Sequence, residues 1–170
     1  GEGDGRFLEK LTKVNPNCSV TVFDNSPTML ALAKTRVSNT FQGEVHLYKE
    51  DATNFPFSFE MFDAVVTHFF LDCFTEETLS ALLEKLSSTL RPGGKWLIAD
   101  FVEPSPTALW FIPQFLCLRL LYVFFRLTCG IEARSVISPQ NTLEGLGLKK
   151  TRCINFCNGL LTSLVFIKST

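Results

Sequence analysis

The chain has 170 residues, of which 46% are hydrophobic, and its formal net charge is −1 at pH 7. This length suits one globular domain with a sizeable core, so we expect residues 1–170 to form a single domain. The apolar content excludes an intrinsically disordered chain. The near-zero charge gives no basic signature, so no nucleic-acid partner is expected.

Six cysteines are present, but their spacing does not match a metal site. Only Cys153 and Cys157 lie close together, and no histidine cluster accompanies them. We therefore expect no bound metal. We interpret the cysteines as reduced, mostly buried thiols of a cytoplasmic protein.

The chain opens with a glycine-rich run, Gly1-Glu2-Gly3-Asp4-Gly5, directly before a helical pattern. Alternate glycines let a ligand approach bare backbone, and the free N–H groups of the following helix point at such a loop. A loop of this kind normally follows a buried strand, and here no strand precedes it. The sequence thus indicates a truncated nucleotide-type α/β domain whose first strand is absent from this chain.

Helix and strand patterns alternate along the rest of the sequence. In chain order the expected elements are a helix at 6–14, a strand at 19–23, a helix at 26–37, strands at 44–48 and 62–67, a helix at 75–90 and strands at 95–99, 148–156 and 160–167. The alternation predicts a Rossmann-like, mostly parallel sheet with helices on both faces. Asn158-Gly159 between the last two strands predicts a closing antiparallel hairpin.

Acidic residues follow two of the predicted strands, and ligands of open parallel sheets bind beyond such strand ends. Asp24 stands where a carboxylate can accept hydrogen bonds from two ribose hydroxyls, and Asp51 where it can contact a purine amine. Each has a simpler explanation, since Asp24 can cap the helix at Ser26 and Asp51 can stabilise a turn. Together they favour a nucleoside ligand.

The glycine spacing narrows the choice of nucleoside. A dinucleotide fingerprint requires a glycine where Arg6 stands, and no Gly-Lys-Ser/Thr follows to complete a phosphate loop. The chain resembles the class I S-adenosylmethionine-dependent methyltransferases. The segments that carry the resemblance are 1–6, 22–26, 50–52, 62–67 and 90–95, together with the terminal hairpin, which is similar to the reversed seventh strand of that family.

The resemblance covers nearly the whole chain except 103–139, and residues 1–7 and 67–74 are similar to uncharacterised bacterial methyltransferases. It implies S-adenosylmethionine as the cofactor. The residues it assigns to cofactor binding are Gly1, Glu2, Gly3, Gly5, Asp24, Asn25, Met29, Asp51, Ala52, Thr67 and His68.

The same resemblance places the methyl acceptor near the end of the strand at 62–67. His68 is a candidate general base, or else a polar residue at the edge of the site. The candidate substrate contacts are Phe69, Asp72, Arg119, Tyr122 and Arg134, although Asp72 can instead cap the helix that follows and Arg134 can pair with a surface acid. The implied reaction is a direct displacement in which the protein mainly positions the reactants, without a metal.

An apolar segment at 108–127 interrupts the alternation, within a helical insertion at 103–139. Arg119, Tyr122 and Arg126 share one face of a helix, and a spanning helix with such a face would be costly. We expect a helix or a broken helical pair that covers the acceptor site as a lid, with peripheral membrane contact as the second interpretation. Either favours an apolar acceptor in a cytoplasmic, or membrane-associated, protein.

The sequence therefore predicts methyl transfer from S-adenosylmethionine to a small, apolar acceptor. A nicotinamide-dependent oxidoreductase is one alternative, which Arg6 and the terminal hairpin disfavour. A non-catalytic relic or interaction protein is the other, because the first strand is absent. The oligomeric state and the identity of the acceptor stay open.

Overall fold

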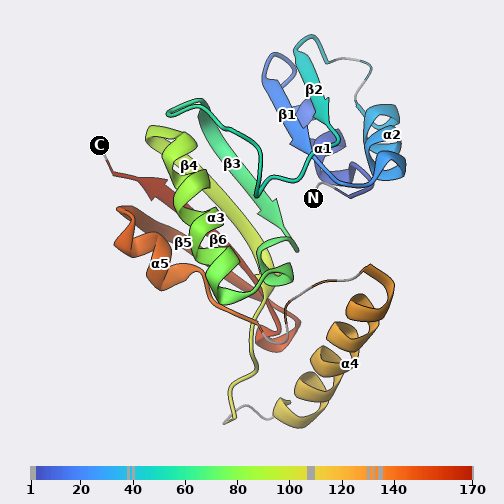
Figure 1. The fold of residues 1–170 in the computed structure, drawn as a ribbon, viewed down its shortest axis with the longest axis vertical. Helices are drawn as coiled ribbons and strands as arrows, with labels where there is room; N and C mark the ends of the chain where they lie inside the picture. Colours follow the sequence, from blue (N-terminus) through green and yellow to red (C-terminus); the bar gives the residue numbers. More distant parts are fainter. Residues whose placement is uncertain are drawn as a thin grey trace. The chain divides into compact units, whose positions relative to one another are not determined.

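The computed structural model in Figure 1 describes residues 3–37, 39, 41–106, 110–129, 131, 133 and 136–169, without the side chains of residues 128 and 129. The chain divides into two compact units, Gly1–Pro56 and Phe57–Thr170. Each unit has its own sheet and its own apolar core.

The first unit is built on two parallel strands. In chain order its elements are α1 (Arg6–Val14), β1 (Ser19–Phe23), α2 (Pro27–Thr35) and β2 (Glu44–Tyr48). The register pairs Ser19 with Glu44 and Phe23 with Tyr48, so the two strands begin and end level with each other. Their carboxyl ends therefore form one edge, which carries Asp24 and the segment that follows Tyr48.

The two helices of the first unit share a core with the strands. Leu8 of α1, Val22 of β1, and Leu30 and Ala33 of α2 are buried together. Ser26 caps α2 as expected, because its hydroxyl accepts a hydrogen bond from the Met29 N–H at 3.3 Å. Burial of one face of each element gives the unit its stability.

The second unit contains a four-stranded sheet. Its elements are β3 (Phe62–His68), the short 3₁₀ helix η1 (Leu71–Cys73), α3 (Glu76–Thr89), β4 (Leu90–Phe101), α4 (Phe111–Cys129), α5 (Gln140–Gly145), β5 (Leu148–Phe156), the 3₁₀ turn η2 (Cys157–Gly159) and β6 (Leu161–Lys168). The strand order is β3-β4-β6-β5. Strands β3 and β4 are parallel, and β6 is antiparallel to both of its neighbours.

Three strands of this sheet therefore run in one direction, and β6 alone is reversed. This arrangement confirms the predicted α/β class with a mostly parallel sheet. The expected C-terminal hairpin is also present, and Asn158 and Gly159 both have positive φ in its turn.

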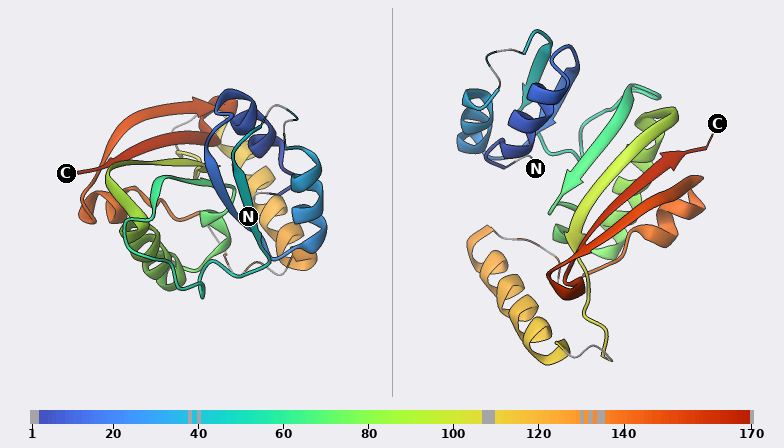
Figure 2. Two further views of the ribbon diagram at one scale, coloured as in Figure 1. Left: turned by 90° about the horizontal axis from the view of Figure 1, so that it is seen from above. Right: turned by 180° about the vertical axis from the view of Figure 1, so that it is seen from behind.

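The core of the second unit lies between the sheet and two helices. Figures 1 and 2 show α3 and α5 on the same face of the four strands. Alternation along β4 turns Trp96, Ile98 and Asp100 to the buried face. Trp96 and Ile98 meet leucines of α3 and Leu143 of α5 there. Asp100 is thus drawn into an apolar environment by the period of the strand.

Local details differ from the sequence-based expectations. Strand β4 begins at Leu90 and absorbs the Pro92-Gly93-Gly94 stop signal as an irregularity in its pairing with β3. In the described part of the insertion, α4 runs unbroken through Pro113, because this proline falls in the first turn, where a missing N–H costs little. Helix α5 was not expected, and Cys117, Cys153 and Cys157 are exposed rather than buried.

The contact between Gly5 and Ala33 yields a prediction about stability. Gly5 has φ +84° and a Cβ built on it would lie 2.4 Å from the Ala33 Cα, whereas Gly3 has φ +66° and open space around its Cβ position. Gly3→Ala should cost only the left-handed backbone penalty of about 1–2 kcal/mol. Gly5→Ala adds a steric clash and should cost about 2–5 kcal/mol in total. Urea unfolding of the two variants measures this difference, and equal losses would contradict the packing shown here.

Candidate functional site

Asp24 joins the glycine loop to the start of α2. Its Oδ2 accepts a hydrogen bond from the Gly3 N–H at 3.2 Å, and its Oδ1 accepts one from the Ser26 N–H at 2.8 Å. A carboxylate has about four acceptor positions, so both oxygens keep capacity for a further donor. The structure therefore brings together two of the predicted cofactor residues, Gly3 and Asp24, at the carboxyl edge of β1 and β2.

A second acid, Asp4 within the glycine loop itself, forms ion pairs that hold the loop in place. The Asp4 carboxylate accepts hydrogen bonds from Arg6 at 2.9 Å and from Arg36, just beyond α2, at 3.1 Å. The loop is thus tied to both ends of α2, through Asp24 and Ser26 at its start and through Arg36 at its end. Gly1 and Glu2, which the sequence assigns to the same loop, lie outside the described residues.

Asp51 adopts the turn conformation that its position suggested. Its Oδ1 accepts hydrogen bonds from the backbone N–H of Thr53 at 2.8 Å and from the Thr53 hydroxyl at 2.7 Å. Ala52 beside it is buried. The Asp24 N–H donates to the Tyr48 carbonyl at 3.2 Å, which extends the pairing of β1 and β2 to the edge where Asp51 follows. Of the other predicted cofactor residues of this unit, Asn25 is exposed and Met29 half-buried.

An aromatic cluster at this edge was not recognised from the sequence. The rings of Phe23 and Tyr48 stack with centroids 5.2 Å apart, and Phe55 packs edge-on against both at 4.7 and 5.3 Å. Phe23 and Tyr48 are the last residues of β1 and β2, so their positions at level strand ends were the available signal. The cluster offers an apolar surface beside two acids.

The end of β3 carries the predicted residues of the second unit. The Thr67 hydroxyl is buried and accepts a hydrogen bond from the Trp96 Nε1–H at 3.0 Å, so it belongs to the core. His68 is half-buried, and desolvation lowers its pKa, which favours the neutral imidazole at pH 7. Phe69 has φ +50°, an uncommon value for an aromatic residue, and its exposed ring packs against Phe101 at 5.3 Å.

Three side chains, from η1, β4 and α4, lie together near the carboxyl ends of β3 and β4. Tyr122 of α4 donates from its hydroxyl to the Asp72 Oδ2 and to the Asp72 carbonyl, both at 3.4 Å. The Asp72 carboxyl also interacts with that of Asp100, which is only 5% exposed. Two predicted substrate residues, Asp72 and Tyr122, thus lie together. Asp100 was not among the predicted site residues, although it directly follows the predicted strand at 95–99 just as Asp24 follows the predicted strand at 19–23.

Burial dominates the electrostatics of this cluster. The pKa of Asp100 is raised to about 9, chiefly by desolvation and then by the negative charge of Asp72, while the backbone amides of Asp72 and Leu71 offset part of the effect. Desolvation likewise raises the pKa of Asp72 and raises that of Cys73 to about 12. At pH 7 Asp100 is therefore the protonated member of the pair and Cys73 is an unreactive thiol.

Helix α4 covers this cluster with one of its faces. Gln114 donates to the carbonyls of Cys157 and Asn158 at 3.0 and 3.2 Å, while Leu118 and Tyr122 are buried one and two turns later. Arg119, a predicted substrate residue, instead pairs with Glu103 at 3.1 Å and lies over the Phe115 ring. Arg134 lies outside the described residues.

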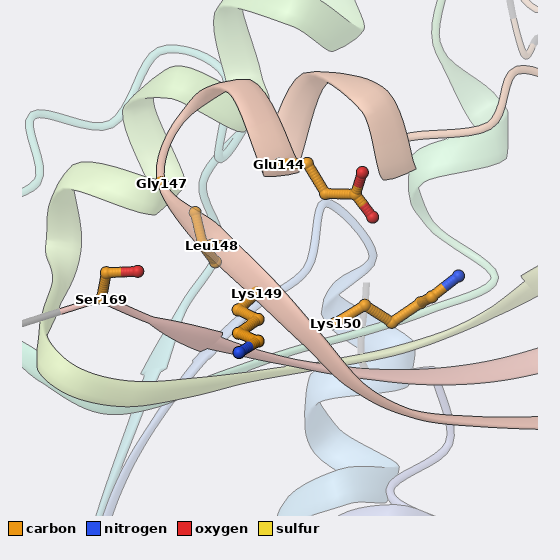
Figure 3. Close-up of a pocket in the computed structure, with 6 residues that line it drawn as sticks. All are labelled: Glu144, Gly147, Leu148, Lys149, Lys150 and Ser169. Carbon is orange, nitrogen blue, oxygen red and sulfur yellow. The ribbon is translucent and has the colours of Figure 1, made fainter.

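A shallow hollow at the opposite end of the four-stranded sheet carries none of the predicted residues. Figure 3 shows its lining, which comes from Glu144, Gly147, Leu148, Lys149, Lys150 and Ser169. It lies where β5 begins and β6 has ended, whereas Asp100 lies near the end of β4. The amine of Lys150 is held by the Gln140 side chain at 2.9 Å.

Comparison with known proteins assigns the chain to a family. Residues 1–94, more than half of the chain, match the family described as "Methyltransferase domain". This match includes the glycine loop, Asp24, Asp51 and the end of β3. The chain belongs to this family, the class I S-adenosylmethionine-dependent methyltransferases, as its motifs predicted.

Two curated relatives of the chain are both named as the same C-methyltransferase, UbiE. The chain is 36% identical over 105 residues to the ubiquinone/menaquinone biosynthesis C-methyltransferase UbiE of Blochmanniella floridana, a match that covers 61% of this chain and 41% of the relative. It is 25% identical over 175 residues to UbiE of Vibrio parahaemolyticus, covering 95% of this chain and 67% of the relative. The chain thus spans about two fifths to two thirds of the length of these relatives.

Solved structures share the fold at low sequence identity. A SAM-dependent methyltransferase of Methanosarcina mazei superposes with a TM-score of 0.67 at 20% identity, covering 99% of this chain and 90% of the other. A family 2 O-methyltransferase of Planctomyces limnophilus, in complex with apigenin, gives 0.72 at 22% identity, covering 98% of this chain and 48% of the other. Human N-acetylserotonin methyltransferase in complex with SAM gives 0.66 at 21% identity, covering 100% and 46%.

The pKa of Asp100 predicts a pH-dependent stability. Its carboxyl has an ordinary pKa of 3.8 and a pKa of about 9 in the folded protein. Between these values the unfolded chain releases a proton that the folded chain keeps, so stability falls as the pH rises. Asp100→Asn removes this dependence while keeping the shape of the side chain. We expect D100N to exceed the wild type by about 1–3 kcal/mol at pH 8 and by less at pH 5.

Urea unfolding at the two pH values measures the effect. Asp63→Asn serves as the matched control, because Asp63 is an exposed carboxylate in a surface ion pair with Arg91 at 2.7 Å. Its loss should change stability by no more than about 1 kcal/mol, with little pH dependence. A D100N variant that is less stable than the wild type at both pH values would refute the raised pKa.

Proposed function

We propose that this protein binds S-adenosylmethionine and transfers its methyl group to a small, apolar acceptor. The observation that carries the proposal is the Asp24 carboxylate, hydrogen-bonded to the Gly3 N–H at 3.2 Å on the carboxyl edge of two level parallel strands. Such an edge is where open α/β sheets bind nucleosides. The family assignment gives the nucleoside its chemical identity.

The residues of the first unit fit the parts of this cofactor. Backbone at Gly3 suits its amino-acid tail, because the space beside it is open and no side chain blocks the approach. Gly5 packs against Ala33, so its assignment to cofactor binding stays a prediction. The remaining acceptor positions of Asp24 suit the two ribose hydroxyls. Asp51 and the Phe23, Tyr48 and Phe55 cluster offer an acceptor and an apolar surface for a purine. When bound, S-adenosylmethionine supplies an electrophilic sulfonium methyl group.

The remaining cofactor assignments stay predictions of the same proposal: Gly1, Glu2, Asn25, Met29, Ala52, Thr67 and His68. The neutral state favoured for His68 by its lowered pKa is compatible with a role as general base. The two alternatives are weaker. The oxidoreductase is disfavoured because the relatives are named as methyltransferases. A measurable affinity for the cofactor would exclude the non-catalytic relic.

The acceptor is proposed to bind in the second unit, at the end of β3. Phe69 presents an exposed ring there, and Asp72 and Tyr122 supply polar groups in otherwise apolar surroundings. The relatives carry the names of C-methyltransferases of ubiquinone and menaquinone biosynthesis. We therefore propose a phenol- or quinol-type ring as the acceptor, with a ring carbon as the methylated atom.

Cofactor binding tests the central proposal directly. Asp24→Ala removes the ribose acceptor and loosens the glycine loop, so we expect its affinity for S-adenosylhomocysteine to fall by at least tenfold. Loss of two backbone contacts should lower the stability by only about 1–2 kcal/mol, leaving the unit folded. Isothermal titration calorimetry gives the affinity and circular dichroism checks the fold.

Glu44→Gln is the control for this experiment. Glu44 is an exposed acid of the same unit, and it lies at the opposite end of the strands from Asp24. Its replacement should leave the affinity unchanged. Equal affinity of the Asp24→Ala variant and the wild type would remove Asp24 from the site, and no binding by the wild type would support the non-catalytic alternative.

We also propose that α4 brings the protein to a membrane surface, where an apolar acceptor dissolves. The outward side chains of Ile112, Leu116, Leu120, Val123, Phe124 and Leu127 are exposed along the helix. Trp110 precedes the helix, and Arg119 and Arg126 lie within it, as in helices that rest in the interface of an anionic bilayer. Among the described helices, none has both the length and the hydropathy needed to span a bilayer.

Charged substitutions among these exposed apolar side chains of α4 test the membrane proposal. Leu116 and Leu120 are 58% and 63% exposed, so replacing both with Glu should leave the fold intact. We expect the double variant to bind anionic phosphatidylglycerol vesicles at least tenfold more weakly, because two apolar insertions are lost and two negative charges are added. Vesicle co-sedimentation measures the binding. Ser80→Glu with Ala81→Glu, on the exposed side of α3, adds the same charges as a control and should have a smaller effect.

Two outcomes contradict membrane binding by α4. One is equal vesicle binding by both double variants. The other is a wild-type protein that does not bind vesicles but forms a dimer. Analytical ultracentrifugation would then show that the Leu116 and Leu120 changes disrupt this dimer.

A further inference from the structure

The Asp100 carboxyl is buried without a hydrogen-bond partner. Among the described residues, neither of its oxygens has a hydrogen-bond partner of ordinary length and angle, and the side chain is 5% exposed. A buried carboxylate in this condition is costly, because it has lost its water and the nearby backbone N–H groups of Leu71 and Asp72 offset only part of that loss. The neighbouring Asp72 carboxylate cannot relieve it, since an ionised carboxylate only accepts hydrogen bonds.

One shared proton resolves this conflict. A protonated Asp100 can donate to Asp72, which turns two repelling charges into a hydrogen-bonded pair with a single charge. The more buried member keeps the proton, because burial disfavours the charged form. Asp72 is then the ionised member, and it is the one that is half-buried rather than enclosed.

The other hydrogen bonds to the Asp72 carboxylate are long or weak. The Tyr122 hydroxyl lies 3.4 Å from the Asp72 Oδ2, whereas ordinary O–H···O hydrogen bonds are about 2.5–3.0 Å long. The Cys73 thiol, at 3.7 Å from the Asp72 Oδ1, is a weak donor. The titratable groups that face Asp72 from η1, β4 and α4 are thus the Cys73 thiol, the Asp100 carboxyl and the Tyr122 phenol, and none of them is positively charged.

We propose that Asp72 binds a hydroxyl group of the methyl acceptor and accepts its proton, that Asp100 positions and tunes Asp72, and that the ligand hydroxyl displaces the long hydrogen bond from Tyr122. This inference rests on the proposed function. It identifies the acceptor as a molecule with an apolar ring and at least one acidic hydroxyl. Phe69 and the apolar neighbours of Tyr122 supply the surface for the ring.

The chemistry balances for a ring hydroxyl. Asp72 takes the hydroxyl proton, which leaves an electron pair shared between the oxygen and the adjacent ring carbon. That carbon forms a bond to the methyl group as the sulfur–methyl bond breaks, and the breaking bond leaves its electron pair on sulfur. The ring carbon then loses its hydrogen as a proton to water, and Asp72 returns its proton to the oxygen. One proton is released for each methyl group transferred.

Ligand discrimination by the whole chain tests the cluster without requiring activity. The probes are 1-naphthol and 1-methoxynaphthalene, which have the same ring and differ in the hydroxyl. We expect the wild type to bind 1-naphthol about tenfold more tightly at pH 7, because a hydrogen bond to a charged group is gained. Fluorescence titration of both probes gives the ratio of dissociation constants.

Replacing each acid with asparagine should affect the preference for 1-naphthol differently. Asp72→Asn loses the charged acceptor, so the preference for 1-naphthol should disappear. Asp100→Asn keeps a neutral side chain that donates to Asp72, so the preference should survive. Loss of preference in both variants would show a merely structural role, and its survival in both would place the hydroxyl elsewhere. Either result overturns the proposal.

Tyr122→Phe keeps the test decisive if Asp72→Asn does not fold. Removal of the tyrosine hydroxyl vacates an Asp72 oxygen, so we expect the preference for 1-naphthol to increase, and an unchanged or reduced preference would contradict the proposal. Calorimetry with S-adenosylhomocysteine separates this inference from the proposed function. Cofactor binding without naphthol discrimination overturns the inference alone, whereas discrimination without cofactor binding overturns only the function.

Discussion

Parallel strand pairing is the constraint on which both candidate sites depend. Adjacent parallel strands end at one edge of a sheet, so the residues that follow them are forced together. In the first unit, level pairing of Phe23 with Tyr48 places Asp24 at that edge. In the second, pairing of His68 with Ala99 places Asp100 one residue beyond the end of β3. Each unit therefore has an acid at a strand end, although the two sheets are separate.

The two acids show how surroundings decide what a carboxylate does. Asp24 accepts hydrogen bonds from two backbone N–H groups at the end of the glycine loop. Asp100 lies on the buried face of β4 and has no hydrogen-bond partner of ordinary geometry among the described residues, and burial raises its pKa to about 9. The first is suited to receiving hydroxyl donors from a ligand. The second is suited to adjusting the basicity of a neighbour.

Much of this could be predicted from sequence because it depends on local signals. Strand and helix bounds matched within a few residues where caps and β-branched runs are clear, as at Ser26 and at the Asn158-Gly159 turn. The role of Asp100 could not be predicted, because its environment depends on how η1 packs against the end of β4. The aromatic cluster escaped notice for a related reason, since Phe55 reaches Phe23 and Tyr48 only through tertiary packing.

Helix α4 shows a further limit of sequence patterns. The helix is apolar on most sides, so its composition does not say which side is buried. The structure distinguishes the faces through Gln114, which bonds the carbonyls of Cys157 and Asn158, and through the burial of Leu118 and Tyr122. Polar anchoring at one position thus orients a helix that hydrophobicity alone would leave undetermined, and the opposite apolar face stays exposed.

The orientation of α4 is linked to the protonation of the acid pair. Desolvation is the largest cause of the raised pKa of Asp100, and Tyr122 forms part of the cover over Asp72 and Asp100. A displacement of α4 that admits water would lower the pKa of Asp100 and release its proton. By reciprocity, loss of that proton would place two negative charges beneath the helix and weaken its contact with the pair. Packing of the helix over the pair and retention of the proton therefore stabilise each other.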